Sequence, residues 1–142
     1  MIMKKVSILV STIDSGGAEK QAVLLAIQLS KHTDVNLIVL YGGHTEYKGN
    51  VDLLTKSSVK VHRLNGSMLL KTIRIRELLK ESHTDVLLNY LTMPDLLGSF
   101  LGKRLKISVY NGIRNSRLPR SKMLIEKWAH NHWATATIYN CY

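Results

Sequence analysis

Short apolar runs alternate with longer amphipathic stretches along the whole chain. The runs are rich in Val, Ile and Leu, as β-strands are, and the stretches between them have the spacing of α-helices. The predicted strands are residues 5–12, 35–41, 59–64, 86–91, 107–110 and 134–139. The predicted helices are residues 17–31, 67–82, 94–105 and 119–128. This alternation predicts an α/β domain with a mostly parallel sheet of about six strands, right-handed crossovers and helices on both faces.

The first predicted strand and the helix that follows it have the sequences of buried elements. The strand at 5–12 is apolar on both faces, which is typical of a central strand in a parallel sheet. The polar residues of the helix share one narrow face and are Lys20, Gln21, Gln28 and Lys31. Residues 42–58 are ambiguous, because Gly-Gly-His-Thr-Glu-Tyr-Lys-Gly-Asn is typical of a loop and residues 51–56 fit a short helix.

The sequence His-Thr-Asp-Val occurs twice, at residues 32–35 and 83–86, each time between a predicted helix and a predicted strand. A duplicated binding site is one interpretation. The other is repeated junction chemistry, in which a histidine suits a helix C-terminus while Asp and Thr turn the chain. The residues around the two copies do not match, so we interpret both as junctions.

Composition and length indicate one soluble, globular domain. The chain has 142 residues, of which 45% are hydrophobic and 21% charged, and no linker or low-complexity segment divides it. No apolar stretch approaches the roughly 18 residues that span a bilayer. Lys4 and Lys5 precede an apolar run, as in a signal peptide, but that run leads into a glycine turn without a cleavage site. Cys141 is the single cysteine, which excludes an intrachain disulfide and suits the cytoplasm.

Positive charge is concentrated in the last third of the chain. The formal net charge is +10, and residues 96–142 contain eight Lys and Arg against one acidic residue, Glu126. A basic surface attracts phosphate, whether in a membrane, a nucleic acid or a substrate. Nucleic-acid binding ranks last, because it predicts aromatic residues among the basic ones, and Tyr110 is the only aromatic residue between Lys103 and Lys127.

Ligands of open α/β sheets bind at the carboxyl ends of the strands, near the point where the strand order reverses. The first candidate loop there is Asp-Ser-Gly-Gly-Ala-Glu, residues 14–19. Gly16 and Gly17 fall at a helix start, whose free N–H groups and dipole favour an anion. The spacing fits neither the dinucleotide-binding fingerprint nor the P-loop, so tight strand–helix packing explains the glycines equally well. Glu19 is predicted to be a first-turn capping carboxylate.

Two further loops at this edge carry polar side chains. After the fourth strand, Asn89 and Thr92 could hydrogen-bond a sugar hydroxyl, although such residues also cap helices. After the fifth strand, residues 110–120 form a dense group of donors, and arginine recognises phosphate or carboxylate through paired hydrogen bonds. A solvated basic loop is the alternative, but the position of the segment favours a ligand. The donors are Asn111, Arg114, Asn115, Arg117 and Arg120.

No catalytic centre is evident in the sequence. His130 and His132 have no Cys, His, Asp or Glu at a spacing that would complete a zinc site, so no metal is predicted. No pair of carboxylates is spaced for acid–base catalysis, and no nucleophile–histidine–acid arrangement stands out. No cofactor is predicted either.

Three segments of the chain resemble retaining GT-B glycosyltransferases of family 4. Residues 4–32 resemble the first strand, the Gly-Gly-Ala-Glu turn and the buried helix of these enzymes. Residues 84–103 resemble their fourth strand and the helix after it. Residues 109–141 resemble the segment from the fifth to the sixth strand in members that build capsule or lipopolysaccharide sugars. The resemblance implies a three-layer Rossmann-like domain, the N-terminal half of a GT-B enzyme.

The resemblance also implies roles for particular residues. In this family the N-terminal domain binds the acceptor, while the C-terminal domain holds the nucleotide-sugar and carries a pair of glutamates. Gly16 and Gly17 would face the donor phosphates. The loop after the fourth strand lacks the histidine or aspartate that touches the transferred sugar in many relatives, so no catalytic residue is assigned. The acceptor side of the cleft would be lined by Asn89, Thr92, Asn111, Arg114 and Asn115.

We therefore expect residues 1–142 to be the acceptor-side domain of a glycosyltransferase of cell-surface polysaccharide synthesis, with a nucleotide-sugar donor and a saccharide or lipid-linked acceptor. The donor-binding domain is absent from this sequence, so the chain alone is expected to be inactive. The expected location is the cytoplasm, at the inner face of the membrane. The alternative is a non-catalytic phosphate-binding module of the same fold. The residues expected to contact anionic lipid are Lys103, Arg104, Arg117, Arg120 and Lys122.

Overall fold

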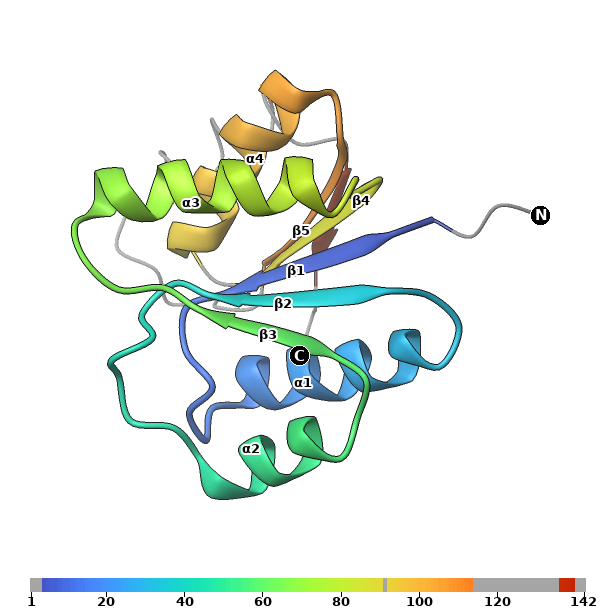
Figure 1. Cartoon of the computed structure of the whole chain (residues 1–142), viewed down its shortest axis with the longest axis vertical. Coiled ribbons are helices and arrows are strands. Elements are labelled where there is room, and N and C mark those ends of the chain that lie inside the picture. Colours follow the sequence, from blue (N-terminus) through green and yellow to red (C-terminus); the bar gives the residue numbers. More distant parts are fainter. Residues whose placement is uncertain (1–3, 91, 114–135, 140–142) are drawn as a thin grey trace.

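The computed structural model describes residues 4–90, 92–113 and 136–139. Over these residues the chain forms a six-stranded sheet with two helices on each face, which gives the three layers expected from the sequence (Figure 1). The strands are β1 (Val6–Val10), β2 (Val35–Val39), β3 (Lys60–Arg63), β4 (Val86–Tyr90), β5 (Ser108–Ile113) and β6 (Ala136–Tyr139). The helices are α1 (Gly17–Ser30), α2 (Lys48–Thr55), α3 (Met68–Glu81) and α4 (Thr92–Leu105).

Every predicted strand is present, and the differences lie at the ends of elements. α2 begins at Lys48, ahead of the predicted short helix at 51–56. β5 continues to Ile113, beyond the predicted end at residue 110, because its polar residues pair with β4 on one side and β6 on the other. The predicted helix at 119–128 lies outside the described residues.

All neighbouring strands are parallel, in the order β3-β2-β1-β4-β5-β6. β1 lies between β2 and β4, so the strand order reverses between β1 and β4. The carboxyl ends of the strands face left in Figure 1, where β1 leads into α1 and β3 leads into α3. Ligands of such a sheet bind at this edge, beside the loops that follow β1 and β4.

β1 is buried over its whole length because helices cover both faces of the sheet. On the face of α1 and α2, Ile8 and Val10 pack with Ala22 and Ala26 of α1. On the face of α3 and α4, Leu9 belongs to a second buried apolar cluster. Each fully buried aliphatic side chain contributes about 1.5–3 kcal/mol of transfer free energy, so both layers hold the central strands in place.

α4 approaches the sheet closely at two of its glycines. A Cβ atom at Gly98 would overlap the side-chain amide of Asn89, and a Cβ atom at Gly102 would overlap Cγ2 of Val109. Neither glycine has a positive φ angle. Close packing of the helix on β4 and β5, rather than backbone conformation, is therefore what requires a glycine at these positions.

The two His-Thr-Asp-Val segments lead into β2 and β4, the two neighbours of β1. In the first copy, the hydroxyl of Thr33 donates to the carbonyl of Lys4 at 2.7 Å. In the second copy, the carboxylate of Asp85 accepts from the backbone N–H of Lys5 at 2.9 Å. Both copies thus lie at helix–strand junctions, as predicted, and their bonds to Lys4 and Lys5, at the start of β1, are a finding of the structure.

Candidate functional site

The glycine turn lies at the carboxyl end of β1, beside the reversal in strand order. Gly16 is the N-cap of α1 and has extended backbone angles, φ −61° and ψ 156°, with no side-chain cap. Gly17 is the first residue of the helix, and neither residue has a positive φ angle. Backbone conformation therefore does not require a glycine at either position.

The space around the two glycines separates the packing explanation from the ligand explanation. A Cβ atom at Gly16 would meet the carboxylate of Glu19, which is the far end of a flexible side chain. At Gly17, apart from its two chain neighbours and the backbone of its own helix, no atom of the described residues lies within 4 Å of where a Cβ atom would stand. Among the described residues, close packing of the helix on the strand therefore requires neither glycine, and the space at the Cβ position of Gly17 is open.

Glu19 folds back over the start of its own helix. It is the acidic residue of the first turn of α1, and its Oε1 atom accepts a weak hydrogen bond of 3.4 Å from the hydroxyl of Thr12. A carboxylate near the positive end of the helix dipole stabilises the helix. The one hydrogen bond recorded for Glu19 comes from Thr12, so capping of a backbone N–H stays a prediction. An anionic ligand at Gly16 and Gly17 would have to share this position or displace the Glu19 side chain.

A side-chain hydrogen bond ties the glycine turn to the loop after β2. His44 Nε2 lies 3.1 Å from Asp14 Oδ2, and the backbone N–H of Ser15 donates to Asp14 Oδ1 at 2.8 Å. The hydrogen bond from the Ser15 backbone, and to a smaller extent the one from His44, lowers the pKa of Asp14 below 3.8. The carboxylate of Asp14 is therefore charged at neutral pH and is already occupied by two partners.

A buried asparagine also holds this turn. Asn50, on α2, is 2% exposed, and its side-chain amide donates to the carbonyls of Asp14 at 3.0 Å and Ile13 at 3.4 Å. Asn50 was not among the residues predicted from the sequence to be functional. Its position four residues before the buried Leu54 places both on one face of α2, and that spacing was the available signal.

The predicted acceptor residues fall into three groups. Asn89 is 1% exposed and packs beneath Gly98 of α4, so it lies in the interior rather than on the wall of an open cleft. Asn111 pairs in register with Asn89 on the neighbouring strand, and Thr92 begins α4, so the structure brings these backbone positions together near the carboxyl edge. The other predicted contact residues lie outside the described residues and are Arg114, Asn115, Arg117, Arg120 and Lys122.

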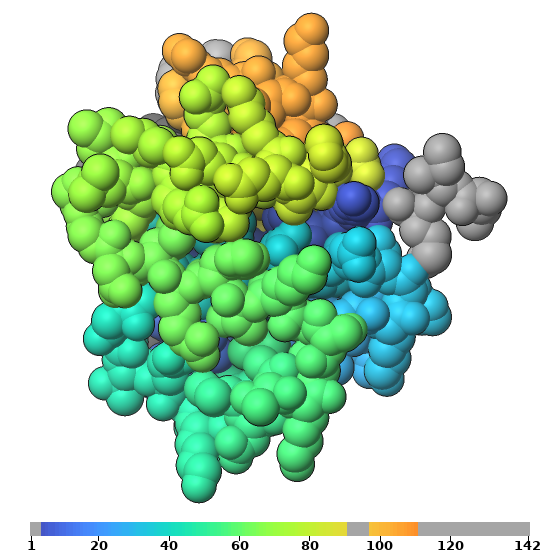
Figure 2. Space-filling model, in the orientation of Figure 1, coloured from blue at the N-terminus to red at the C-terminus, as the bar shows by residue number. Residues whose placement is uncertain are grey.

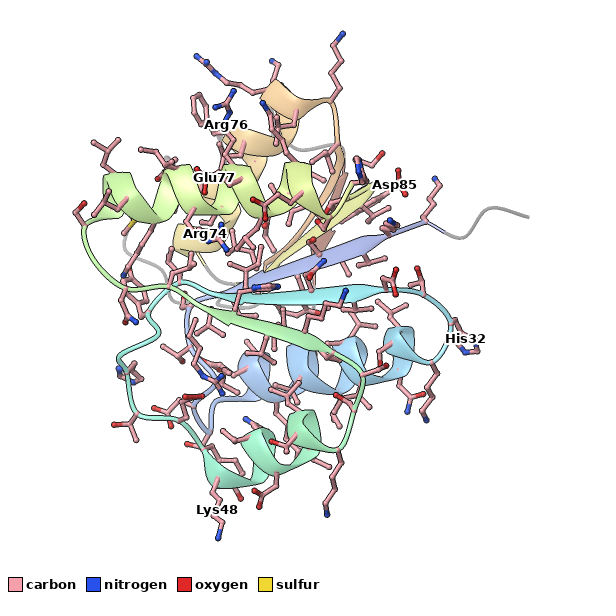
Figure 3. The ribbon with its side chains drawn as sticks, viewed as in Figure 1. His32, Lys48, Arg74, Arg76, Glu77 and Asp85 are labelled. Atoms are coloured by element: carbon pink, nitrogen blue, oxygen red, sulfur yellow. The ribbon has the colours of Figure 1, made fainter. Side chains whose placement is uncertain are left out.

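Lys103 and Arg104 do not join the glycine turn. Both are exposed and belong to the last turn of α4, whereas α4 begins at the carboxyl edge of the sheet. The guanidinium of Arg104 stacks 5.0 Å from the centre of the Phe100 ring. On α3, Arg74 forms an ion pair with Glu77 at 3.3 Å (Figure 3).

The part of the chain that the structure describes bears on metal binding and on membrane insertion. The described residues contain no group of three or more His, Cys, Asp or Glu side chains that could hold a metal ion. None of the helices within 4–90 and 92–113 is both long and apolar enough to cross a membrane.

The chain is similar in sequence to a known enzyme and in fold to several solved structures. No protein-family model matches the chain. Over 95 residues, or 63% of the chain, it is 33% identical to the Campylobacter jejuni enzyme GalNAc-α-(1→4)-GalNAc-α-(1→3)-diNAcBac-PP-undecaprenol α-1,4-N-acetyl-D-galactosaminyltransferase. Its fold is similar to that of Acinetobacter baumannii MurG, with a TM-score of 0.66 and 15% identity over 96% of the chain. The chain is similar to part of a glycosyltransferase, and its fold is similar to that of MurG, a GT-B enzyme.

The resemblance to GT-B enzymes inferred from the sequence is thereby confirmed, and membership of family 4 stays a prediction. The same fold also occurs in Helicobacter pylori ADP-L-glycero-D-manno-heptose-6-epimerase, with a TM-score of 0.60 and 11% identity over 91% of this chain. Fold alone therefore does not select an activity, whereas the sequence match is to a glycosyltransferase. The matched region spans 26% of the Campylobacter enzyme, and the chain covers 41% of the MurG chain.

Proposed function

We propose that this chain is the acceptor-side domain of a glycosyltransferase that moves a sugar from a nucleotide-sugar to a lipid-linked acceptor in cell-surface polysaccharide synthesis. The observation that carries the proposal is the open space at Gly17, at the start of α1 and beside the reversal in strand order. The sequence relative supports the same class of reaction, because its name specifies a sugar-PP-undecaprenol substrate.

In this proposal the glycine turn binds the diphosphate of the donor. The first N–H groups of a helix have no partner within the helix, and the macrodipole adds the equivalent of about half a positive charge there. Negative charge grows on the diphosphate as the sugar leaves. Backbone N–H groups at Gly16 and Gly17 would stabilise that charge most strongly when it is fully developed, which lowers the barrier to transfer.

In this proposal, binding of the nucleotide-sugar and the remaining steps of transfer depend on residues outside 1–142. A second domain outside residues 1–142 would hold the nucleotide-sugar and supply the pair of glutamates, and transfer would retain the anomeric configuration. Residues 1–142 alone are then expected not to transfer sugar. Thr92, Asn111, Arg114 and Asn115 would contact the acceptor, and Asn89 would support α4 from beneath.

We also propose that the protein binds the surface of an anionic membrane. Leu69, Leu70 and Ile73 are 71%, 59% and 46% exposed in the first half of α3, which begins at the carboxyl edge of the sheet. Figure 2 shows α3, in yellow-green, lying along the surface. Exposed apolar side chains can enter the headgroup region, and each basic residue near an anionic leaflet adds about 1 kcal/mol of attraction. Lys103 and Arg104, at the other end of the helical layer, would add to it with α3 and α4 lying flat on the membrane.

The test is a transfer assay on the full product of the gene that encodes this chain. The protein is incubated with a set of nucleotide-sugars, each labelled in the sugar, and with a saccharide linked to a prenyl diphosphate. We expect label to enter the lipid-linked product together with release of a nucleoside diphosphate. If no donor supports transfer while the protein still binds pyrophosphate, the non-catalytic phosphate-binding module becomes the better account.

A further inference from the structure

The segment after β2 and the first turn of α2 hold the chain immediately before the two glycines. The backbone N–H of Tyr47 donates to the carbonyl of Ile13 at 3.0 Å. The side-chain amide of Asn50 reaches the same carbonyl at 3.4 Å and the carbonyl of Asp14 at 3.0 Å. The Ile13 carbonyl thus has two donors, whereas the only donor found for the Asp14 carbonyl among the described residues is Asn50.

Asn50 is a polar residue at a buried position, where burial of an apolar side chain would be more favourable in free energy. It is 2% exposed, and it lies one helical turn before Leu54, a member of the apolar cluster between α1 and the sheet. A buried amide without hydrogen bonds is costly, so its placement is stable only because both recorded bonds are made. Those bonds go to the backbone of the glycine turn and to no other segment.

We propose that Asn50 is the positioning residue of the glycine turn. By holding the Asp14 carbonyl, it fixes the direction in which the chain enters Gly16 and Gly17, and so aims their N–H groups at a diphosphate. This inference rests on the proposed function, because it takes the turn to be the site of the donor phosphates. A preorganised set of N–H groups binds an anion more tightly than a mobile set, since less ordering is needed on binding.

The experiment compares Asn50→Leu with a control on the same helix. Asn50→Leu keeps the branching and the number of side-chain heavy atoms, although leucine is larger, and it removes both donated hydrogen bonds. Leu54→Ala removes buried apolar contacts from α2 and leaves every recorded bond to the turn in place. Asn50→Ser, a smaller change in polarity that also removes the amide, replaces Asn50→Leu if that variant does not fold.

Two quantities are measured on each protein by NMR. The first is the backbone order parameter of the Gly16 and Gly17 amides, which reports the rigidity of the turn without any ligand. The second is the dissociation constant of inorganic pyrophosphate, followed by the shifts of the same two amides. Unfolding temperatures are recorded in parallel, so that general destabilisation is visible.

We expect Asn50→Leu to lower the order parameters from about 0.85 toward 0.6 and to weaken pyrophosphate binding by about tenfold. Leu54→Ala should lower the unfolding temperature at least as much and change neither quantity appreciably. If Asn50→Leu leaves the order parameters at the values of the control, the inference about Asn50 is wrong. If the turn loosens as expected but the wild-type chain does not bind pyrophosphate, the phosphate role of the turn is wrong and the positioning role of Asn50 stands.

Discussion

Replacing Gly17 by alanine tests whether this glycine serves the fold or a ligand. Gly17 begins α1 without a positive φ angle, and apart from its chain neighbours and the backbone of its own helix no atom of the described residues lies within 4 Å of where the new methyl group would stand. The methyl group would therefore cause no overlap. Glycine in a helix is less favourable than alanine by about 0.5–1 kcal/mol, so Gly17→Ala should raise the free energy of unfolding by up to that amount. For a domain of this size the unfolding temperature rises by about 1–4 °C.

Urea denaturation of the wild-type and Gly17→Ala chains, with thermal unfolding beside it, measures this effect. Gly16→Ala is the matched comparison, because its methyl group would displace the carboxylate of Glu19 from the start of α1. We expect that variant to be no more stable than the wild type, since the helix loses a favourable charge interaction. A loss of more than about 1 kcal/mol on Gly17→Ala would refute the reasoning, because it would reveal a structural neighbour at that position.

Three further predictions concern packing and pH. Gly102→Ala should lower the free energy of unfolding, measured by urea denaturation, by about 1–3 kcal/mol, because the new methyl group would overlap Val109. Adding Val109→Ala removes the overlapping methyl group, so the double variant should regain part of the stability lost in Gly102→Ala. His44→Ala should raise the pKa of Asp14 toward 3.8, measured by NMR titration of the carboxyl carbon, since it removes a hydrogen bond to the charged form. Burial, and to a smaller extent the nearby positive charges of Arg74 and Lys60, lowers the pKa of His62 below 6.5. The unfolded chain therefore binds a proton at this residue more readily than the folded chain does. As the pH falls below 6.5, stability should therefore fall more steeply in the wild type than in His62→Gln, and equal slopes in urea denaturation would contradict this.

The sequence predicted the strands well because a parallel sheet covered on both faces demands continuous apolar runs. β1 and β2 are buried over their whole lengths, so their hydrophobicity is unambiguous. β5 was predicted too short, because Asn111 and Gly112 have low strand propensity and are held in the strand by pairing with β4 and β6. α2 was placed too late for a similar reason. Its first turn contains Gly49 and Asn50, and tertiary hydrogen bonds override their weak helix propensity.

The position of the candidate site was predicted from the sequence, but the atoms that surround its two glycines were not. The rule for parallel sheets selected the turn at Gly16 and Gly17 correctly as a loop at the carboxyl edge. Whether those glycines serve packing or a ligand depends on which atoms surround them, and only the arrangement in space gives that. Asn89 was predicted to face a ligand, yet it lies on the same side of β4 as the buried Leu87, beneath α4. Strand alternation carried that information.

The measurement that tests the central claim most directly is kcat/KM for sugar transfer by the full gene product, with and without Gly17→Ala. The account predicts that the wild type transfers sugar from a nucleotide-sugar to a lipid-linked acceptor. It also predicts that Gly17→Ala loses at least about tenfold in kcat/KM while its unfolding temperature is unchanged or higher, because the methyl group stands where the diphosphate must approach. Transfer by Gly17→Ala at the wild-type rate would contradict the claim that the open glycine turn binds the donor.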